Sequence, residues 1–200
     1  MAESTSISHR SIYYLPGRGG QLDGPLGMEL VRRGYYLLGR EITNREGSPN
    51  RFFCELAFTD QVKVIANDLQ NYAWSPDSFI LANSFGAYAL LHAVLKLQKC
   101  PAKILLLSPI LGSIRSDGLY FKPPKARLFE QSLQDQMFPQ MNISIVTGRN
   151  DNQVPIPSCQ ALIACSGGKL TVLAEQGHRL EPCLVQQILD KWLPNRNRAA

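Results

Sequence analysis

The chain has 200 residues, of which 44% are hydrophobic and 18% are charged. This balance is enough for one domain with a substantial core, here expected to span residues 1–200, and it excludes an intrinsically disordered chain. The formal net charge of +5 comes from scattered basic residues rather than from a run or a stripe, so we expect no nucleic-acid partner.

The cysteines and the N-terminal segment indicate the cellular compartment of the protein. The five cysteines are odd in number, and none of their spacings is that of a CxxC pair or a zinc site, so we expect reduced thiols and no metal. The opening MAESTSISHR lacks the apolar run of a secretory signal, and no apolar stretch approaches membrane-spanning length. These features predict a cytoplasmic protein that does not insert into membranes.

Along the chain, short apolar runs alternate with helical patterns, which is typical of βαβ units and a parallel sheet. The expected strands cover residues 11–15, 35–39, 78–83, 103–108, 141–148 and 169–175. The expected helices cover 22–34, 58–72 (with Thr59 or Asp60 as N-cap), a segment directly after Ser84, 125–138, 156–168 and 181–193. The sequence therefore predicts an α/β fold with a mainly parallel sheet of about six strands and helices on both faces.

Two segments stand outside this alternation. Residues 109–140 form the longest interval between predicted strands, and Pro123-Pro124 predicts a loop before its helical part. This is the only interval with room for a small lid. Residues 195–200, NRNRAA, have the composition of a frayed tail.

A serine lies between the third strand and the helix that follows it, in the sequence Ala82-Asn83-Ser84-Phe85-Gly86. A strand that enters a helix through a sharp turn, with a nucleophile at its apex, is a nucleophile elbow. Such a turn strains its central residue, and small residues two positions away relieve the crowding. A serine that merely caps the helix is the alternative, but a cap does not require small neighbours.

This turn and the order of the strands resemble the α/β-hydrolase superfamily, whose elbow pattern is G-x-S-x-G, with Ala82 here in place of the first glycine. The resemblance covers Ser11 to Leu193. It implies an acid and then a histidine after the serine: Asp151 in RNDNQVP, with Asp117 as the alternative acid, and His178 in EQGHRL.

The resemblance also extends to the loop LPGRGG, which is similar to the family's His-Gly-x oxyanion loop, with Pro16 where the family often has His. It implies that an oxyanion would be held by the backbone N–H of Phe85 together with that of Arg18 or Gly19. Because the strand before this loop begins near residue 11, we expect this chain to lack the family's usual N-terminal antiparallel strand pair.

The function implied is hydrolysis of an ester or thioester bond through an acyl-enzyme, with an amide as a further option, on a small-molecule acyl substrate and without a cofactor. A small lid favours short or soluble substrates. The alternative from another class is a binding protein that keeps the scaffold without turnover.

Several arginines fall at or soon after predicted strand ends, on the rim that carries Ser84. These are Arg18, Arg40, Arg115, Arg149 and Arg179. They suggest an anionic substrate, with Arg40, Arg149 and Arg179 as candidate contacts, against the alternative that arginines favour exposed loops in any case. Of the other polar residues, Asp68 and Glu175 are expected to be solvated, and His92 to be packed within its helix.

Overall fold

A computed structural model of the protein describes residues 11–42, 51–97, 99–116 and 119–194. Its centre is a six-stranded sheet in the order β2-β1-β3-β4-β7-β8, and every neighbouring pair is parallel. The strands are β1 (Ser11–Leu15), β2 (Tyr36–Gly39), β3 (Phe79–Asn83), β4 (Cys100–Leu107), β7 (Met141–Gly148) and β8 (Lys169–Leu173). The predicted parallel α/β fold is confirmed.

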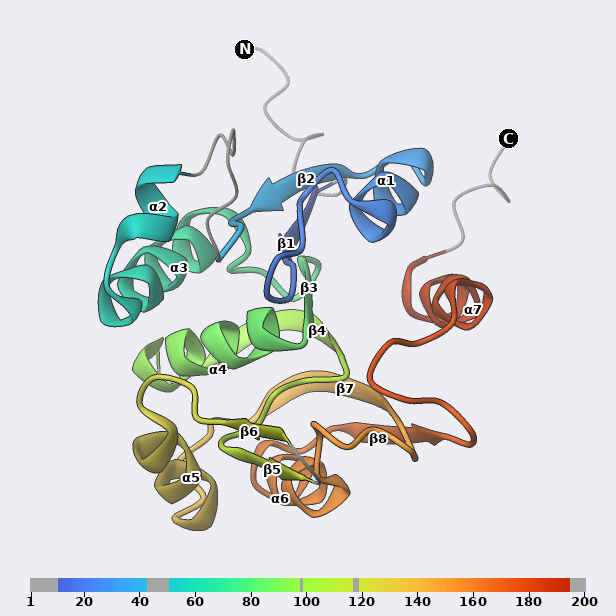
Figure 1. Cartoon of the computed structure of the whole chain (residues 1–200). Coiled ribbons are helices and arrows are strands. Elements are labelled where there is room, and N and C mark those ends of the chain that lie inside the picture. The colour runs from blue at the N-terminus through green and yellow to red at the C-terminus, as the bar shows by residue number, and fades with distance from the viewer. Residues whose placement is uncertain (1–10, 43–50, 98, 117–118, 195–200) are drawn as a thin grey trace.

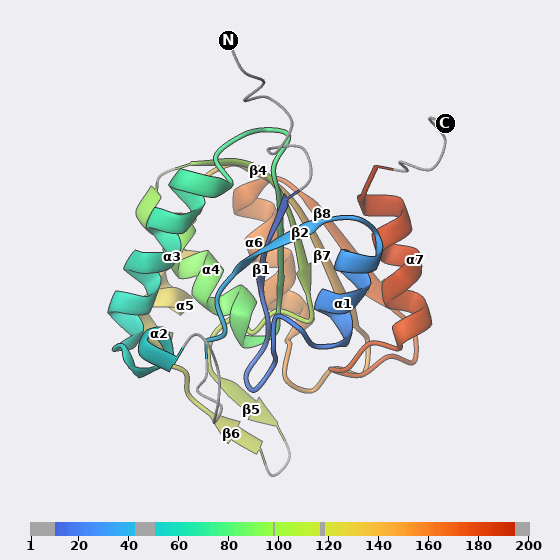
Figure 2. The same ribbon diagram turned by 90° about the horizontal axis from the view of Figure 1, so that it is seen from above.

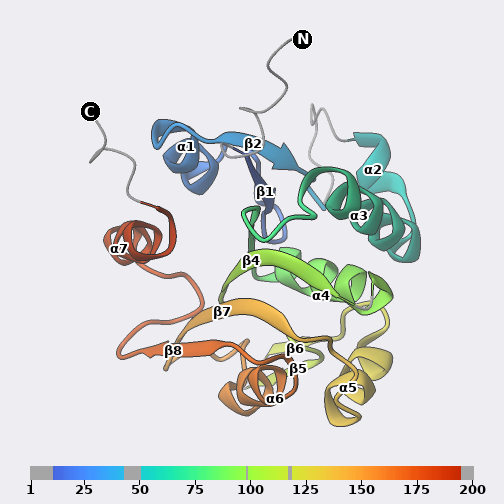
Figure 3. The same ribbon diagram turned by 180° about the vertical axis from the view of Figure 1, so that it is seen from behind.

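Helices cover both faces of the sheet (Figures 1 and 2). On one face lie α1 (Pro25–Arg32) and α7 (Pro182–Trp192). On the other lie α3 (Phe58–Tyr72), α4 (Phe85–Leu97) and α6 (Ile156–Ser166), together with the shorter α2 (Arg51–Glu55) and α5 (Ala126–Gln134). Figure 3 shows the same layers from behind, with α1 and α7 on one side of the strands.

The core divides into two clusters because successive strand residues point to opposite faces. In β1, Ile12 and Tyr14 belong to the cluster under α1 and α7, whereas Tyr13 and Leu15 belong to the cluster under α3 and α4. Both faces of the strand are buried, which explains its continuous apolar sequence. Helix α4 is buried from Phe85 to Val94, as its apolar sequence predicts.

The structure departs from the sequence prediction in the segment 109–140. It contains an antiparallel hairpin, β5 (Ile114–Ser116) and β6 (Leu119–Phe121), before α5. Strands of three residues are too short to show a period-two pattern, so they could not be predicted from the sequence. Helix α2 was also missed.

Some local predictions are wrong, and others concern residues outside the described part of the chain. Helix α3 begins after Ala57, which has no side-chain cap bond, so Thr59 and Asp60 are not N-caps but lie inside the helix. The alternative acid Asp117 and the tail 195–200 lie outside the described residues, as does the side chain of Arg115.

Candidate functional site

The turn between β3 and α4 has the geometry of a nucleophile elbow. Ser84 has φ 50°, in the left-handed region that residues with a side chain seldom adopt. Its N–H donates to the Leu107 carbonyl at 3.0 Å, and its own carbonyl accepts from the Ile110 N–H at 3.1 Å. The strained residue is therefore held from both sides by the chain that leaves β4.

Gly86 shows why the elbow needs small residues. A Cβ placed on Gly86 would lie 2.2 Å from the Leu15 carbonyl oxygen and 2.5 Å from that of Pro16. The end of β1 thus packs directly against the first turn of α4, and only glycine permits this approach. Ala82 is fully buried in β3, in register with Leu15 of β1.

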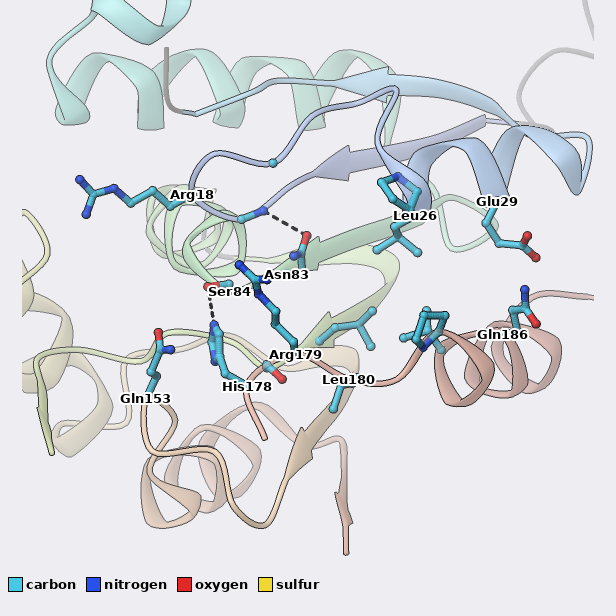
Figure 4. Close-up of a pocket in the computed structure, with 17 residues that line it drawn as sticks. Arg18, Leu26, Glu29, Asn83, Ser84, Gln153, His178, Arg179, Leu180 and Gln186 are labelled. Atoms are coloured by element: carbon cyan, nitrogen blue, oxygen red, sulfur yellow. Dashed lines mark hydrogen bonds between the residues drawn. The ribbon is translucent and has the colours of Figure 1, made fainter. Parts of the chain in front are cut away.

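Three side chains that are distant in sequence meet above this elbow. The Ser84 hydroxyl lies 2.9 Å from His178 Nε2, and His178 Nδ1 lies 2.9 Å from Asp151 Oδ2 (Figure 4 draws the first of these bonds). An ionised carboxylate can only accept, so this arrangement fits a proton on Nδ1. Nε2 is then free to accept the Ser84 hydroxyl hydrogen.

The Asp151 carboxylate is fixed by its surroundings. Its side chain has no exposed surface, while that of His178 is 17% exposed. The Gln153 N–H donates to Oδ1 at 2.9 Å, and the Thr147 hydroxyl donates to Oδ2 at 3.4 Å. The acid therefore has several donors directed at it from the end of β7 and the following loop, and it holds the imidazole in one orientation.

The loop after β1 is tied to the residue before the serine. The Gly20 N–H donates to the Gly17 carbonyl at 2.9 Å, which closes a turn with Gly19 at φ 73°. The Gly17 N–H donates to Asn83 Oδ1 at 3.1 Å, and the Tyr14 hydroxyl donates to the same oxygen at 3.2 Å. Asn83 was not predicted from the sequence, where its place beside Ser84 was the only signal of its role.

Of the residues expected to hold an oxyanion, Phe85 is the first residue of α4, where backbone N–H groups lack partners within the helix. Arg18 lines the pocket described next, whereas Gly19 and Phe85 are not among the described residues that line it.

A pocket of about 630 Å³ opens beside Ser84, on the face of the sheet that α1 and α7 cover. Apolar side chains form much of its wall, and polar side chains lie toward Ser84 and at the helices (Figure 4). The lining residues are Gly17, Arg18, Gly20, Pro25, Leu26, Glu29, Asn83, Ser84, Leu107, Ser108, Gln153, His178, Arg179, Leu180, Pro182, Val185 and Gln186.

Two helices far apart in the sequence thus form the pocket walls, and an ion-pair network joins them. Arg33, the C-cap residue of α1, donates to Asp190 of α7 at 2.6 Å and to Glu29 of α1 at 2.7 Å. Burial raises the pKa of the Glu29 carboxyl, but hydrogen bonds from Arg32 and Arg33 outweigh burial and hold that pKa below its ordinary value. The segment 109–140, the interval with room for a small lid, contributes none of its described residues to the lining.

The structure separates the candidate arginines. All three of Arg18, Arg149 and Arg179 are exposed, but only Arg18 and Arg179 line the pocket. Arg40 is not brought to the pocket either, because its guanidinium binds both oxygens of Asp68 in α3, at 2.8 and 3.1 Å. Asp68, expected to be solvated, is 7% exposed and also accepts from the Tyr13 hydroxyl at 2.8 Å.

The cysteines and possible metal ligands form no second reactive centre in the part of the chain that the structure describes. All five cysteines are free thiols, and burial raises the pKa of Cys100 to about 11 and that of Cys159 to about 12. Within the described ranges, no three His, Cys, Asp or Glu side chains group as metal ligands would. None of the described helices combines the length and the apolar character needed to cross a membrane.

Comparison with known proteins gives a fold but no close relative. No protein-family model and no curated protein sequence matches the chain. Many solved structures do match in fold. A monoacylglycerol lipase from Paleococcus ferrophilus is 12% identical with a TM-score of 0.68, and the match covers 90% of this chain and 91% of the lipase.

Two further matches agree with this one. Alpha/beta hydrolase domain-containing protein 10 from mouse is 14% identical, with a TM-score of 0.63 and 90% of each chain covered. Est1E from Butyrivibrio proteoclasticus, solved with ferulic acid, is 14% identical, with a TM-score of 0.64, 91% of this chain covered and 87% of that chain. These likenesses establish the expected α/β-hydrolase fold.

Proposed function

Since the chain has the α/β-hydrolase fold, we propose that it is a serine hydrolase that cleaves an ester or thioester bond of a small-molecule acyl substrate. The observation that carries this proposal is the continuous hydrogen-bonded series Ser84–His178–Asp151. A serine hydroxyl is a weak nucleophile at neutral pH and needs a base within hydrogen-bond reach. The 2.9 Å contact to Nε2 supplies one.

In the first step, Ser84 Oγ attacks the carbonyl carbon of the substrate and His178 Nε2 takes the hydroxyl proton. Asp151 stabilises the positive charge that then forms on the imidazole. The tetrahedral intermediate collapses, His178 returns the proton to the departing alcohol or thiol, and an acyl group remains on Ser84. A water, deprotonated by His178, then releases the acid.

The oxyanion of the intermediate would be stabilised by backbone N–H groups, with Phe85 and either Arg18 or Gly19 as the candidate donors. Phe85 suits this role because it begins α4, where the helix dipole favours negative charge. One such donor contributes about 3 kcal/mol to lowering the barrier. The bond from Gly17 to Asn83 supports the second donor by fixing the loop that carries it.

The pocket volume and lining favour small substrates. About 630 Å³ is within the range of small-molecule sites, and the apolar side chains of Leu26, Leu180 and Val185 suit a short hydrocarbon group. Because the reaction uses only protein side chains, the proposal includes no cofactor.

The test is labelling of the purified protein with a fluorophosphonate, which reacts with activated serines. We expect rapid labelling of the wild type and none of Ser84→Ala or His178→Ala. Asp151→Asn should lower ester hydrolysis by about 10⁴-fold, because it removes the charge that stabilises the imidazolium. Circular dichroism of each variant checks that the fold is retained.

A wild-type protein that is folded but unlabelled, and that hydrolyses no ester or thioester, would overturn this proposal. The scaffold would then be a binding protein without turnover, the alternative that the replacement of the family's glycine by Ala82 and of its histidine by Pro16 leaves open.

A further inference from the structure

Two hydrogen-bond donor groups beside Ser84 have no acceptor among the described residues. One is Asn83 Nδ2. The oxygen of the same amide accepts from the Gly17 N–H and the Tyr14 hydroxyl, which fixes the orientation of the amide and leaves Nδ2 without a partner in the described part of the chain. The other is the guanidinium of Arg179, which lines the pocket without a hydrogen bond or ion pair to the part of the chain that the structure describes. Both groups come from residues adjacent in sequence to the proposed catalytic side chains.

The two arginines that line the pocket, Arg179 and Arg18, point in different directions. In Figure 4 the Arg179 side chain points toward Asn83 at the end of β3, whereas the Arg18 side chain points away from Ser84. The Arg18 guanidinium lies 5.7 Å from the centroid of the Phe121 ring, a cation–π distance. Arg179 is thus the guanidinium best placed to meet a group bound next to Ser84.

The acidic side chains near the pocket do not compensate Arg179. The Glu29 carboxylate is bound by Arg32 at the end of its own helix and by the C-cap residue Arg33, at 2.7 Å in each case. The Asp151 carboxylate is bound by His178. No carboxylate of the described residues therefore balances the exposed Arg179 guanidinium on the side of the pocket toward Asn83, and an acceptor with one negative charge would balance it.

We infer that the preferred substrate carries a carboxylate close to the scissile acyl group, held by the Arg179 guanidinium and Asn83 Nδ2. This inference rests on the proposed hydrolase function. A guanidinium and an amide are planar donors that match the two oxygens of a carboxylate. One guanidinium balances one negative charge, which favours a carboxylate over a phosphate dianion. The rest of the substrate would lie between α1 and α7, against Leu26 and Val185.

The experiment compares esters that differ only in the charge. On the acyl side, monomethyl glutarate is compared with methyl valerate by release of methanol. On the alcohol side, acetoxyacetate is compared with propyl acetate by release of acetate. The readout is the ratio of kcat/KM for the charged ester to that for the neutral ester, in wild type, Arg179→Gln, Arg179→Lys and two control variants.

The control variants distinguish a direct contact between Arg179 and the substrate from the effect of the overall positive charge of the protein. Arg127→Gln removes an exposed positive charge on α5, away from the pocket, and Arg149→Gln removes one from the loop before Asp151. We expect Arg179→Gln to lower the charged-to-neutral ratio of kcat/KM by about 10-fold, mainly by raising KM for the charged ester. The ester pair in which the ratio falls shows on which side of the scissile bond the carboxylate lies. Arg179→Lys should restore part of the ratio.

An unchanged ratio in Arg179→Gln, while neutral esters are still hydrolysed, would overturn this inference and leave the hydrolase function standing. An equal loss in Arg149→Gln or Arg127→Gln would also overturn it, because the preference would then come from the general field of the protein. Absence of both fluorophosphonate labelling and ester hydrolysis in the wild type would overturn the function and the inference together.

Discussion

The side-chain oxygen of Asn83 accepts the backbone N–H of Gly17, so the residue before the proposed nucleophile holds the loop that follows β1. The two residues are 66 positions apart and meet because β1 and β3 are neighbouring parallel strands. A Cβ on Gly17 would lie 3.0 Å from the Ser84 Cβ, so this loop passes directly over the elbow. The bond therefore links the position of the nucleophile to that of the loop.

We expect Asn83→Ala to lower kcat for neutral esters by about 10-fold, because the loop loses its anchor and its N–H groups are no longer fixed for the transition state. KM for the same esters should change less. Tyr14→Phe is the matched control, since it removes the other donor to Asn83 and leaves the bond to Gly17. Steady-state kinetics of both variants are the measurement, and equal losses of kcat would contradict the anchoring role.

The sequence was sufficient to predict that Ser84, Asp151 and His178 lie together, as their hydrogen bonds show, because each follows the end of a predicted strand and the family resemblance implies their order. In a parallel sheet, the carboxyl ends of all strands lie at one edge, so three local patterns predict one three-dimensional site. The fold followed from the same alternation of strands and helices.

The sequence was not sufficient where the role of a residue depends on which side chain from another element it contacts. Arg40 follows a strand end as expected, yet its guanidinium binds Asp68 on α3, 28 residues later. Nothing in the local pattern of either residue indicates this pairing. The pocket wall on α7 was missed for the same reason, since the packing of α7 beside α1 places Val185 in the lining of the pocket that Ser84 also lines.

Gly86 gives a prediction about stability. Gly86→Ala should destabilise the protein by roughly 3 kcal/mol, because the added methyl group would collide with the backbone carbonyls of Leu15 and Pro16, which cannot move without disturbing β1. Gly177→Ala is the control, because nothing lies within 4 Å of its added Cβ. Urea denaturation of both variants measures the difference, and similar midpoints would show that the end of β1 can relax.

The Arg40–Asp68 pair gives a second prediction about stability. Asp68→Ala leaves the Tyr13 hydroxyl and the Arg40 guanidinium without their shared acceptor, and it should lower the free energy of unfolding by about 2 kcal/mol. Arg40→Ala should cost less, since the Arg40 side chain is 35% exposed and Asp68 keeps its bond from Tyr13. A double-mutant cycle from chemical denaturation gives the coupling energy, and a value near zero would refute the pairing.

His92 makes the stability depend on pH. Its ring is packed among those of Phe58, Tyr88 and Phe129, and burial, together with the charge of Lys96, lowers the pKa of His92 to about 4. The unfolded chain binds a proton near pH 6.5, whereas the folded chain binds it only near pH 4. Between these values the unfolded state holds more protons, so stability falls as the pH is lowered.

The wild type should therefore lose about 2 kcal/mol of unfolding free energy from this residue between pH 7 and pH 5, a contribution that His92→Leu and His92→Phe both remove. Both replacements are apolar and differ from histidine by a small volume, so they can pack against the rings of Phe58, Tyr88 and Phe129. Denaturation midpoints at several pH values, compared between wild type and the two variants, isolate the His92 contribution from those of other groups. Parallel pH profiles in all three proteins would mean that the buried imidazole accepts a proton in the folded state as readily as in the unfolded chain.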